Sequence, residues 1–141
     1  MRLTLILIGL LAVIAAFTWS RRTTPPARIE AAQGPIGSLE GDRQVLQQLL
    51  QAGADLSKPT EVNYYLYYQD RAAADSAAAR GSSAPLVASV QRAADNSAWL
   101  CLVTGTMVPS ESNIRAHTTR LVALAQATGG QYDGWEAAVT K

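Results

Sequence analysis

This sequence of 141 residues has very few of the side chains on which metal proteins and most enzymes depend. Its only cysteine, Cys101, excludes an intrachain disulfide and a cysteine-based metal cluster. Its only histidine, His117, has no second histidine with which to share a metal, so we predict a partly buried structural role for it. Nucleophile motifs, phosphate-binding loops and paired carboxylates flanked by polar residues are also absent. We therefore expect no enzymatic activity, no metal and no cofactor.

The sequence also lacks an excess of either charge. It contains 12 basic and 11 acidic residues, and nine basic residues remain when Arg2, Arg21 and Arg22 near the N-terminus are set aside. A nearly neutral domain offers nucleic acid no broad electrostatic footprint. Direct binding of nucleic acid is therefore not expected.

A long apolar run stands at the N-terminus and predicts a transmembrane anchor in residues 1–20. Residues 3–19 would form about 26 Å of helix, close to the roughly 30 Å of a bilayer's hydrocarbon core. Arg2 and Trp19 stand where interfacial anchors are expected. The rival interpretation is a cleaved secretory signal, which the bulky Phe17 and Trp19 and the missing Ala-x-Ala pattern disfavour.

A linker rich in proline and glycine, residues 21–37, follows the apolar run. Arg21, Arg22 and Arg28 outnumber the positive charges before the run, so the positive-inside rule favours a cytoplasmic C-terminal domain. We therefore expect a single-pass protein of the bacterial inner membrane, with the domain formed by residues 38–141 in the cytoplasm.

Residues 38–141 show alternating helix and strand signals. The expected elements, in chain order, are a helix capped by Asp42 and ended by Gly53, a strand at 61–68, a helix after Asp70 ended by Gly81, strands at 85–92 and 98–108, a helix from Ser110 to Thr128, and a last strand after Gly130. After the first helix this is the order βαββαβ. It predicts an α+β fold, a ferredoxin-like sandwich with an antiparallel four-stranded sheet and an extra N-terminal helix.

Aromatic residues in the predicted strands indicate a binding surface. Tyr65 and Tyr67 alternate with core positions, so they point toward the sheet face that the two later helices leave uncovered. The N-terminal helix is the one predicted element that could hide this face. If the face is open, its tyrosines form an amphipathic platform of the kind that protein partners use.

The C-terminal stretch GGQYDGWEAAV, residues 129–139, is the most distinctive part of the sequence. In the βαββαβ plan, the last strand lies beside the first, which brings this stretch next to Tyr65 and Tyr67. A glycine inside a strand often marks a bulge or a close approach of another backbone, and we expect one of these two features at Gly134. Asp133 and Glu136 would lie on opposite faces unless such a bulge intervenes. The alternative is that this stretch only shapes the last strand.

Several stretches together resemble the regulator of ribonuclease E activity B family. They are LLQAGADL (49–56), the tyrosine-rich strand with its alanine-rich helix, Trp99 before a strand ending in MVPS, and LVALAQATGGQYDGWEAAV (121–139). The resemblance covers about residues 43–139. It implies a non-enzymatic, ferredoxin-like protein that binds the endoribonuclease RNase E and restrains RNA cleavage.

We expect a membrane-tethered regulator whose partner is a protein, with RNase E the candidate that the resemblance supplies. The predicted partner-binding residues are Tyr65, Tyr67, Trp99, Tyr132, Asp133, Gly134, Trp135 and Glu136. Three alternatives remain open at this stage: a module that binds single-stranded RNA on the aromatic sheet face, an exported binding domain with another partner, and a small-molecule enzyme with a pocket under the helices.

Overall fold

The computed structural model describes residues 28–29 and 36–141 of the chain. The predicted membrane segment, residues 3–19, and most of the predicted linker lie outside this part. None of the helices in the described part has the length and apolar character needed to cross a membrane.

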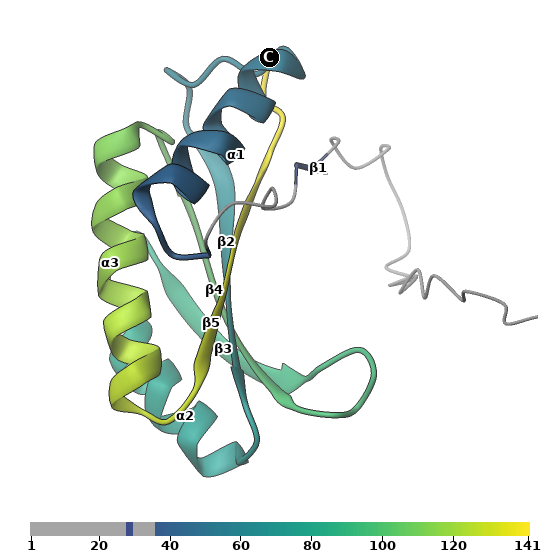
Figure 1. The fold of residues 1–141 in the computed structure, drawn as a ribbon, viewed down its shortest axis with the longest axis vertical. Helices are drawn as coiled ribbons and strands as arrows, with labels where there is room; N and C mark the ends of the chain where they lie inside the picture. The colour runs from purple at the N-terminus through teal and green to yellow at the C-terminus, as the bar shows by residue number, and fades with distance from the viewer. Residues whose placement is uncertain (1–27, 30–35) are drawn as a thin grey trace, which may run out of the picture.

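An antiparallel sheet of four long strands and one very short strand forms the centre of the fold (Figure 1). Its strands are β1 (Arg28–Ile29), β2 (Thr60–Tyr68), β3 (Val87–Arg92), β4 (Trp99–Met107) and β5 (Gln131–Ala138). They lie in the order β1-β5-β2-β4-β3, and every neighbouring pair is antiparallel. The predicted α+β class and βαββαβ element order are confirmed, as is the pairing of the first and last long strands. Strand β1 was not predicted, because two residues in a linker give no periodic signal.

The described part contains three helices, α1 (Leu39–Gln51), α2 (Arg71–Gly81) and α3 (Glu111–Ala127). Asp70 caps α2 by accepting a hydrogen bond from the Ala73 backbone N–H at 3.0 Å. Ser110 caps α3 in the same way through the Asn113 N–H at 3.2 Å. Both caps were predicted from the sequence, because Asp and Ser side chains satisfy the free N–H groups of a first helical turn.

The predicted cap of α1 is wrong. Ser38 caps this helix, and its Oγ accepts a hydrogen bond from the Gly41 N–H at 3.0 Å. Asp42 lies inside the first turn, where its side chain is buried. Its carboxylate accepts hydrogen bonds from residues of α3 and β5 and does not cap the helix. Gly53 follows the end of α1 with a φ of 87°, as the predicted stop requires.

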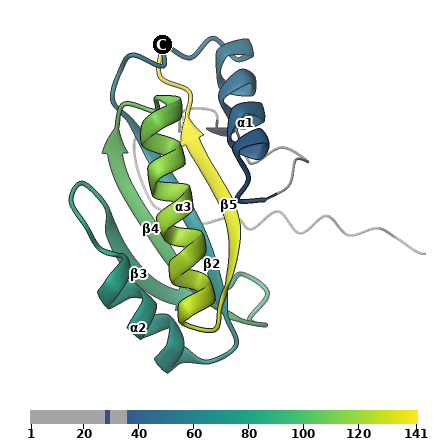
Figure 2. The ribbon, with the colours of Figure 1, turned by 60° about the vertical axis from the view of Figure 1, so that its left-hand side comes forward.

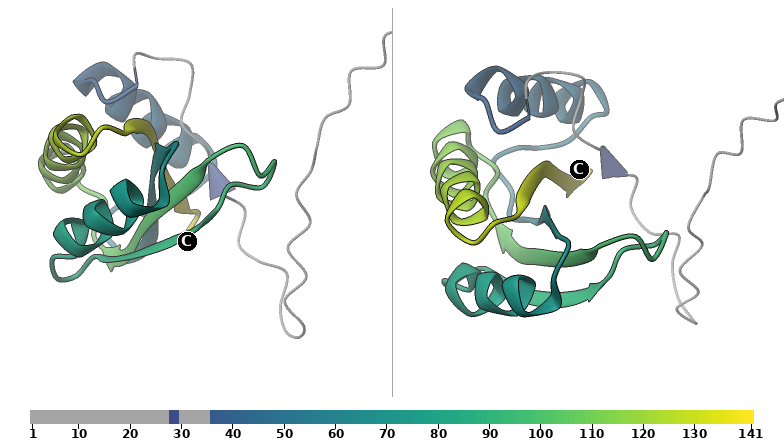
Figure 3. Two further views of the ribbon diagram at one scale, coloured as in Figure 1. Left: turned by 90° about the horizontal axis from the view of Figure 1, so that it is seen from below. Right: turned by 60° about the horizontal axis from the view of Figure 1, so that its bottom comes forward.

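All three helices lie on the same side of the sheet (Figures 2 and 3). Helices α2 and α3 cover the face that carries Tyr64, Leu66 and Tyr68, whose side chains are almost fully buried. Helix α1 packs beside α3 and contributes Val45 and Leu49 to the same core. The opposite sheet face, which we call the open face, is therefore covered by none of the described helices.

A bulge in β5 changes the direction of its side chains. Tyr65 of β2 is paired with Gly134 and the next residue, Leu66, with Tyr132, so Asp133 is an extra residue in β5. Gly134 has a φ of 108°, which a side chain would disfavour. The bulge, one of the two features predicted at Gly134, is confirmed. Beyond it, Trp135 turns toward the helices.

The glycine pair after α3 has a packing reason. Gly129 has a φ of 74°, the left-handed conformation that commonly follows a helix. Gly130 lies against the ring of Tyr68, and a methyl group at this position would overlap that ring. The Tyr68 hydroxyl lies 2.8 Å from Thr128 Oγ1, which fixes the ring beside the turn. The pair therefore lets α3 turn directly into β5.

Candidate functional site

Residues from β2 and β5 meet on the open face. Asn63 is paired with Glu136 and Tyr65 with Gly134, so these side chains share one face of two adjacent strands. Glu136 Oε1 accepts hydrogen bonds from Asn63 Nδ2 at 3.1 Å and from the Tyr65 hydroxyl at 2.7 Å. Glu136 is only 9% exposed, whereas Tyr65 is half-buried. The carboxylate therefore fixes the orientation of Tyr65 and is not itself widely presented to solvent.

Tyr67 and Asp133 extend this surface toward the turn before β5. Tyr67 is half-buried and Asp133 is exposed. Burial raises the pKa of the Tyr67 hydroxyl, and the negative charge of Asp133 raises that pKa further. Partial burial raises the pKa of the Asp133 carboxyl as well. Tyr67 is paired with Gln131, and side chains alternate along β5 from Gln131 to Asp133, so Asp133 lies on the same face as Tyr67. The open face therefore combines aromatic and acidic character.

Trp135 faces the other way, into the layer between the sheet and the helices. Its indole is 2% exposed, and Nε1 donates a hydrogen bond to Asp42 Oδ1 at 3.0 Å. The same oxygen accepts a hydrogen bond from Thr118 Oγ1 at 3.1 Å, and Asp42 Oδ2 forms an ion pair with Arg115 at 2.9 Å. Arg115 also donates to the carbonyl of Gly37, just before α1. Asp42 thus joins α1, α3 and β5 through one buried carboxylate.

The other predicted site residues separate into two groups. Tyr132 is 8% exposed and belongs to the core, and Gly134 is buried at the bulge. Trp99, at the start of β4, has the guanidinium groups of Arg71 and Arg92 close to its ring and lies away from Glu136. The structure therefore brings Tyr65, Tyr67, Asp133, Gly134 and Glu136 together on or beside the open face, and it places Trp99, Tyr132 and Trp135 elsewhere. A partner-binding role for these residues remains a prediction.

Residues 39–137 match the protein family described as Regulator of ribonuclease activity B, abbreviated RraB. The match runs from the start of α1 almost to the end of β5, so it contains both the Asp42 contacts and the open face. The chain belongs to this family. No curated protein matches the chain.

The RraB family is a family of regulators rather than of enzymes, and the chain shares this general class. The match begins at residue 39, so the apolar segment and the linker lie outside the shared domain. Within the described residues, no group of His, Cys, Asp and Glu side chains could hold a metal ion. Family membership therefore rests on the α+β domain alone.

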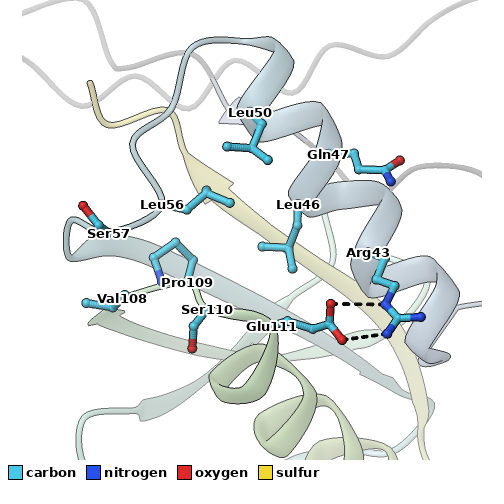
Figure 4. A pocket seen from close by; sticks show the side chains of 10 residues that line it. All are labelled: Arg43, Leu46, Gln47, Leu50, Leu56, Ser57, Val108, Pro109, Ser110 and Glu111. Atoms are coloured by element: carbon cyan, nitrogen blue, oxygen red, sulfur yellow. Dashed lines mark hydrogen bonds and ion pairs between the residues drawn. The ribbon is translucent and has the colours of Figure 1, made fainter.

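Sequence reasoning missed a groove between α1 and the loop that leads into α3 (Figure 4). It encloses about 690 Å³, and its apolar wall includes Leu46, Leu50 and Pro109. At one end, Arg43 forms two hydrogen bonds with Glu111, at 2.9 and 3.1 Å (Figure 4). The sequence pattern places Leu50 on the apolar face of α1, but in the structure it is 55% exposed and lines the groove.

The single cysteine of this RraB-family chain should be unreactive in the folded state. Cys101 is fully buried, and burial raises the pKa of its thiol to about 11 from an ordinary 9.0. Ionisation alone therefore makes the thiolate about a hundredfold scarcer at pH 8. We expect a disulfide-exchange reagent to label the native chain at least about a hundredfold more slowly than the denatured chain, as followed by absorbance. Rapid labelling of the native chain would contradict the burial of Cys101.

Proposed function

We propose that this chain is a membrane-tethered regulator that binds an RNase E-type endoribonuclease and restrains RNA cleavage by covering part of its surface. The observation that carries the proposal is the open face, on which the bulge at Gly134 aligns Glu136 with Tyr65 while none of the described helices covers the strands. Membership of the RraB family supplies the class of target.

The chemistry of the open face suits a partner segment that carries basic side chains. Tyr65 and Tyr67 offer ring surface, and tyrosine gives a large contact area at a low entropic cost. Asp133 adds an exposed carboxylate beside Tyr67. Arginine suits such a mixed surface, because its guanidinium can stack on a ring and pair with a carboxylate at once.

The apolar segment at residues 3–19 gives the proposal its location. An anchor there would hold the domain at the inner membrane, and the linker would allow it to reach a partner on the same surface. Such tethering raises the effective concentration of the regulator without any new contact. The proposal requires the domain to face the cytoplasm.

The alternative of RNA binding on the same face has weaker support. An RNA-binding sheet of this plan stacks bases on aromatic residues and contacts phosphates through basic ones. Strand β4 presents Leu100, Leu102 and Thr104 to the open face, and none of these is aromatic or basic. On β4, therefore, the open face has neither the aromatic residues that stack on bases nor the basic residues that contact phosphates.

The Tyr67→Ala and Asp133→Lys variants test the proposed surface. We expect each to weaken binding to purified RNase E, and inhibition of RNA cleavage, by about tenfold or more, because both side chains would lie in the contact area. Binding should be measured with the full chain in mild detergent, and cleavage with a labelled RNA substrate. Both variants should unfold at nearly the same temperature as the wild type, since neither side chain belongs to the core.

Glu40→Lys is the matched control for Asp133→Lys. It makes the same change of charge on the exposed side of α1, away from the open face. It should leave binding and inhibition unchanged within about twofold. The proposal is wrong if the wild type does not inhibit cleavage, or if the control weakens inhibition as much as the two variants do.

A further inference from the structure

Strand β3 forms one border of the sheet, and part of its backbone is available for pairing. Its only neighbour among the described strands is β4. The Ala88 N–H donates to Ser82 Oγ at 3.0 Å, so the backbone groups of Ala88 point away from β4. Because backbone direction alternates along an antiparallel strand, those of Val90 and Arg92 also point away from β4. The Ser82 hydroxyl therefore occupies one end of this outer edge, and the Val90–Arg92 end is open.

Two arginines meet one tryptophan at the open end of this edge. The guanidinium carbon of Arg92 lies 4.1 Å from the centre of the Trp99 ring, and that of Arg71 lies 5.1 Å from it. Arg92 is the last residue of β3, and Arg71 is the first residue of α2. Stacking on the same indole restrains both side chains, and a guanidinium that stacks through its face can still donate hydrogen bonds from its edge.

Little negative charge balances this pair within the described part of the chain. Arg71 has a contact with Asp75 at 3.6 Å, between side chains that are 66% and 53% exposed. Arg92 forms no ion pair there, and its nearest acceptor is the Asn96 carbonyl at 3.5 Å. Exposed contacts of this kind contribute little stability. Two like charges held on one ring therefore favour an external anion.

We propose that the Val90–Arg92 edge of β3 binds an extended segment of a partner protein that carries a carboxylate side chain. The partner's backbone would pair with the outward N–H and C=O groups of Val90 and Arg92. Its Asp or Glu side chain, on the face that carries Trp99, would accept hydrogen bonds from Arg92 and Arg71. This surface is separate from the open face and does not depend on RNase E as the target.

The backbone argument favours a protein segment over RNA. The free groups on this edge are alternating donors and acceptors, which the backbone of another strand complements. A carboxylate can also pair with a guanidinium through two parallel hydrogen bonds. An RNA strand would use the arginines and the indole but would leave the edge of β3 without partners.

Peptide binding to the full chain in mild detergent tests this proposal. The probe is a fluorescein-labelled peptide of about eight residues in which valine and glutamate alternate. It is long enough to form one strand, and as a strand it carries all its carboxylates on one face. We expect saturable binding by fluorescence anisotropy, weakened about tenfold or more by Arg92→Glu and by Arg71→Glu, since each removes a charge-assisted hydrogen bond. A peptide with lysine in place of glutamate should not bind.

Two further variants separate pairing along the edge from simple charge attraction. Arg80→Glu makes the same charge change in the last turn of α2, where no ring contact is formed, and should bind the peptide as the wild type does. Val90→Pro removes an outward N–H and should weaken binding while leaving the inward pairing with β4 in place. The melting temperature of each variant identifies any that fail to fold, and the arginine variants, both at exposed positions, provide the decisive comparison.

Several results would overturn the proposal. Equal binding of the glutamate and lysine peptides would remove the role of the carboxylate. If Arg80→Glu weakened binding as much as Arg92→Glu does, the effect would come from the net charge of the chain and not from a contact at this edge. Tighter binding of single-stranded RNA or of anionic lipid vesicles than of the peptide, lost in Arg92→Glu, would assign the two arginines to a different kind of partner.

Discussion

The Trp135→Ala variant is expected to lose about 3–5 kcal/mol of the free energy of unfolding, a large share of the roughly 5–15 kcal/mol typical of a single domain. The indole is 2% exposed and packs at a centroid distance of 6.3 Å from Tyr64, so its removal leaves a cavity between the sheet and the helices. It also leaves Asp42 without one of its donors. Urea denaturation of the full chain in detergent, followed by circular dichroism, measures this loss.

Trp135→Phe is expected to lose less, about 1–3 kcal/mol. Phenylalanine keeps a six-membered ring in this layer, but it lacks the N–H donor and the pyrrole part of the indole. In both variants, binding of RNase E per folded molecule should remain unchanged, because Trp135 lies on the helix side of the sheet. A stable Trp135→Ala protein that has lost only its binding would show that the indole takes part in recognition.

The Asp42→Ala variant is expected to be comparably destabilising, by about 3–5 kcal/mol. The substitution removes the acceptor for Trp135, Thr118 and Arg115 and leaves their donors unpaired. A buried ion pair that loses one partner costs more than the pair contributed, because the remaining charge stays partly desolvated. The Arg115 side chain is 31% exposed, so water relieves part of this penalty.

A double-mutant cycle tests whether Asp42 acts through the indole. If it does, Asp42→Ala and Trp135→Phe together should cost less than the sum of the two single losses, by about 0.5–3 kcal/mol. Replacement of the exposed Glu40 of α1 by alanine is the control and should change stability by less than about 0.5 kcal/mol. Additive losses would mean that the hydrogen bond between Asp42 and Trp135 contributes little.

Local signals in the sequence predicted most of the fold. The alternation of Tyr64, Leu66 and Tyr68 with polar neighbours gave β2, and the caps at Asp70 and Ser110 gave the starts of two helices. The start of α1 was misplaced because both Ser38 and Asp42 are suitable caps by residue type. The Asp42 carboxylate instead accepts a hydrogen bond from Trp135, 93 residues away, and no local pattern contains that contact.

The sequence predicted where the candidate site lies better than it predicted which side chains point to the open face. Pairing of the first and last long strands follows from the βαββαβ order, and it brings Tyr65 next to Gly134 as expected. A regular strand that buries Tyr132 would turn Trp135 to the open face and Glu136 to the core. The bulge reverses both, and the backbone geometry of Gly134 decides the result.

The β3 border of the sheet carries features that disfavour its pairing with the same edge of another copy of this chain. Ser82 occupies part of this edge. The short stretch that remains carries Arg92 beside Arg71, and two identical edges would bring four guanidinium groups together. Like charges on an exposed strand are a known protection against aggregation. The same pair of arginines that would attract an acidic segment would therefore disfavour edge-to-edge pairing of two β3 strands.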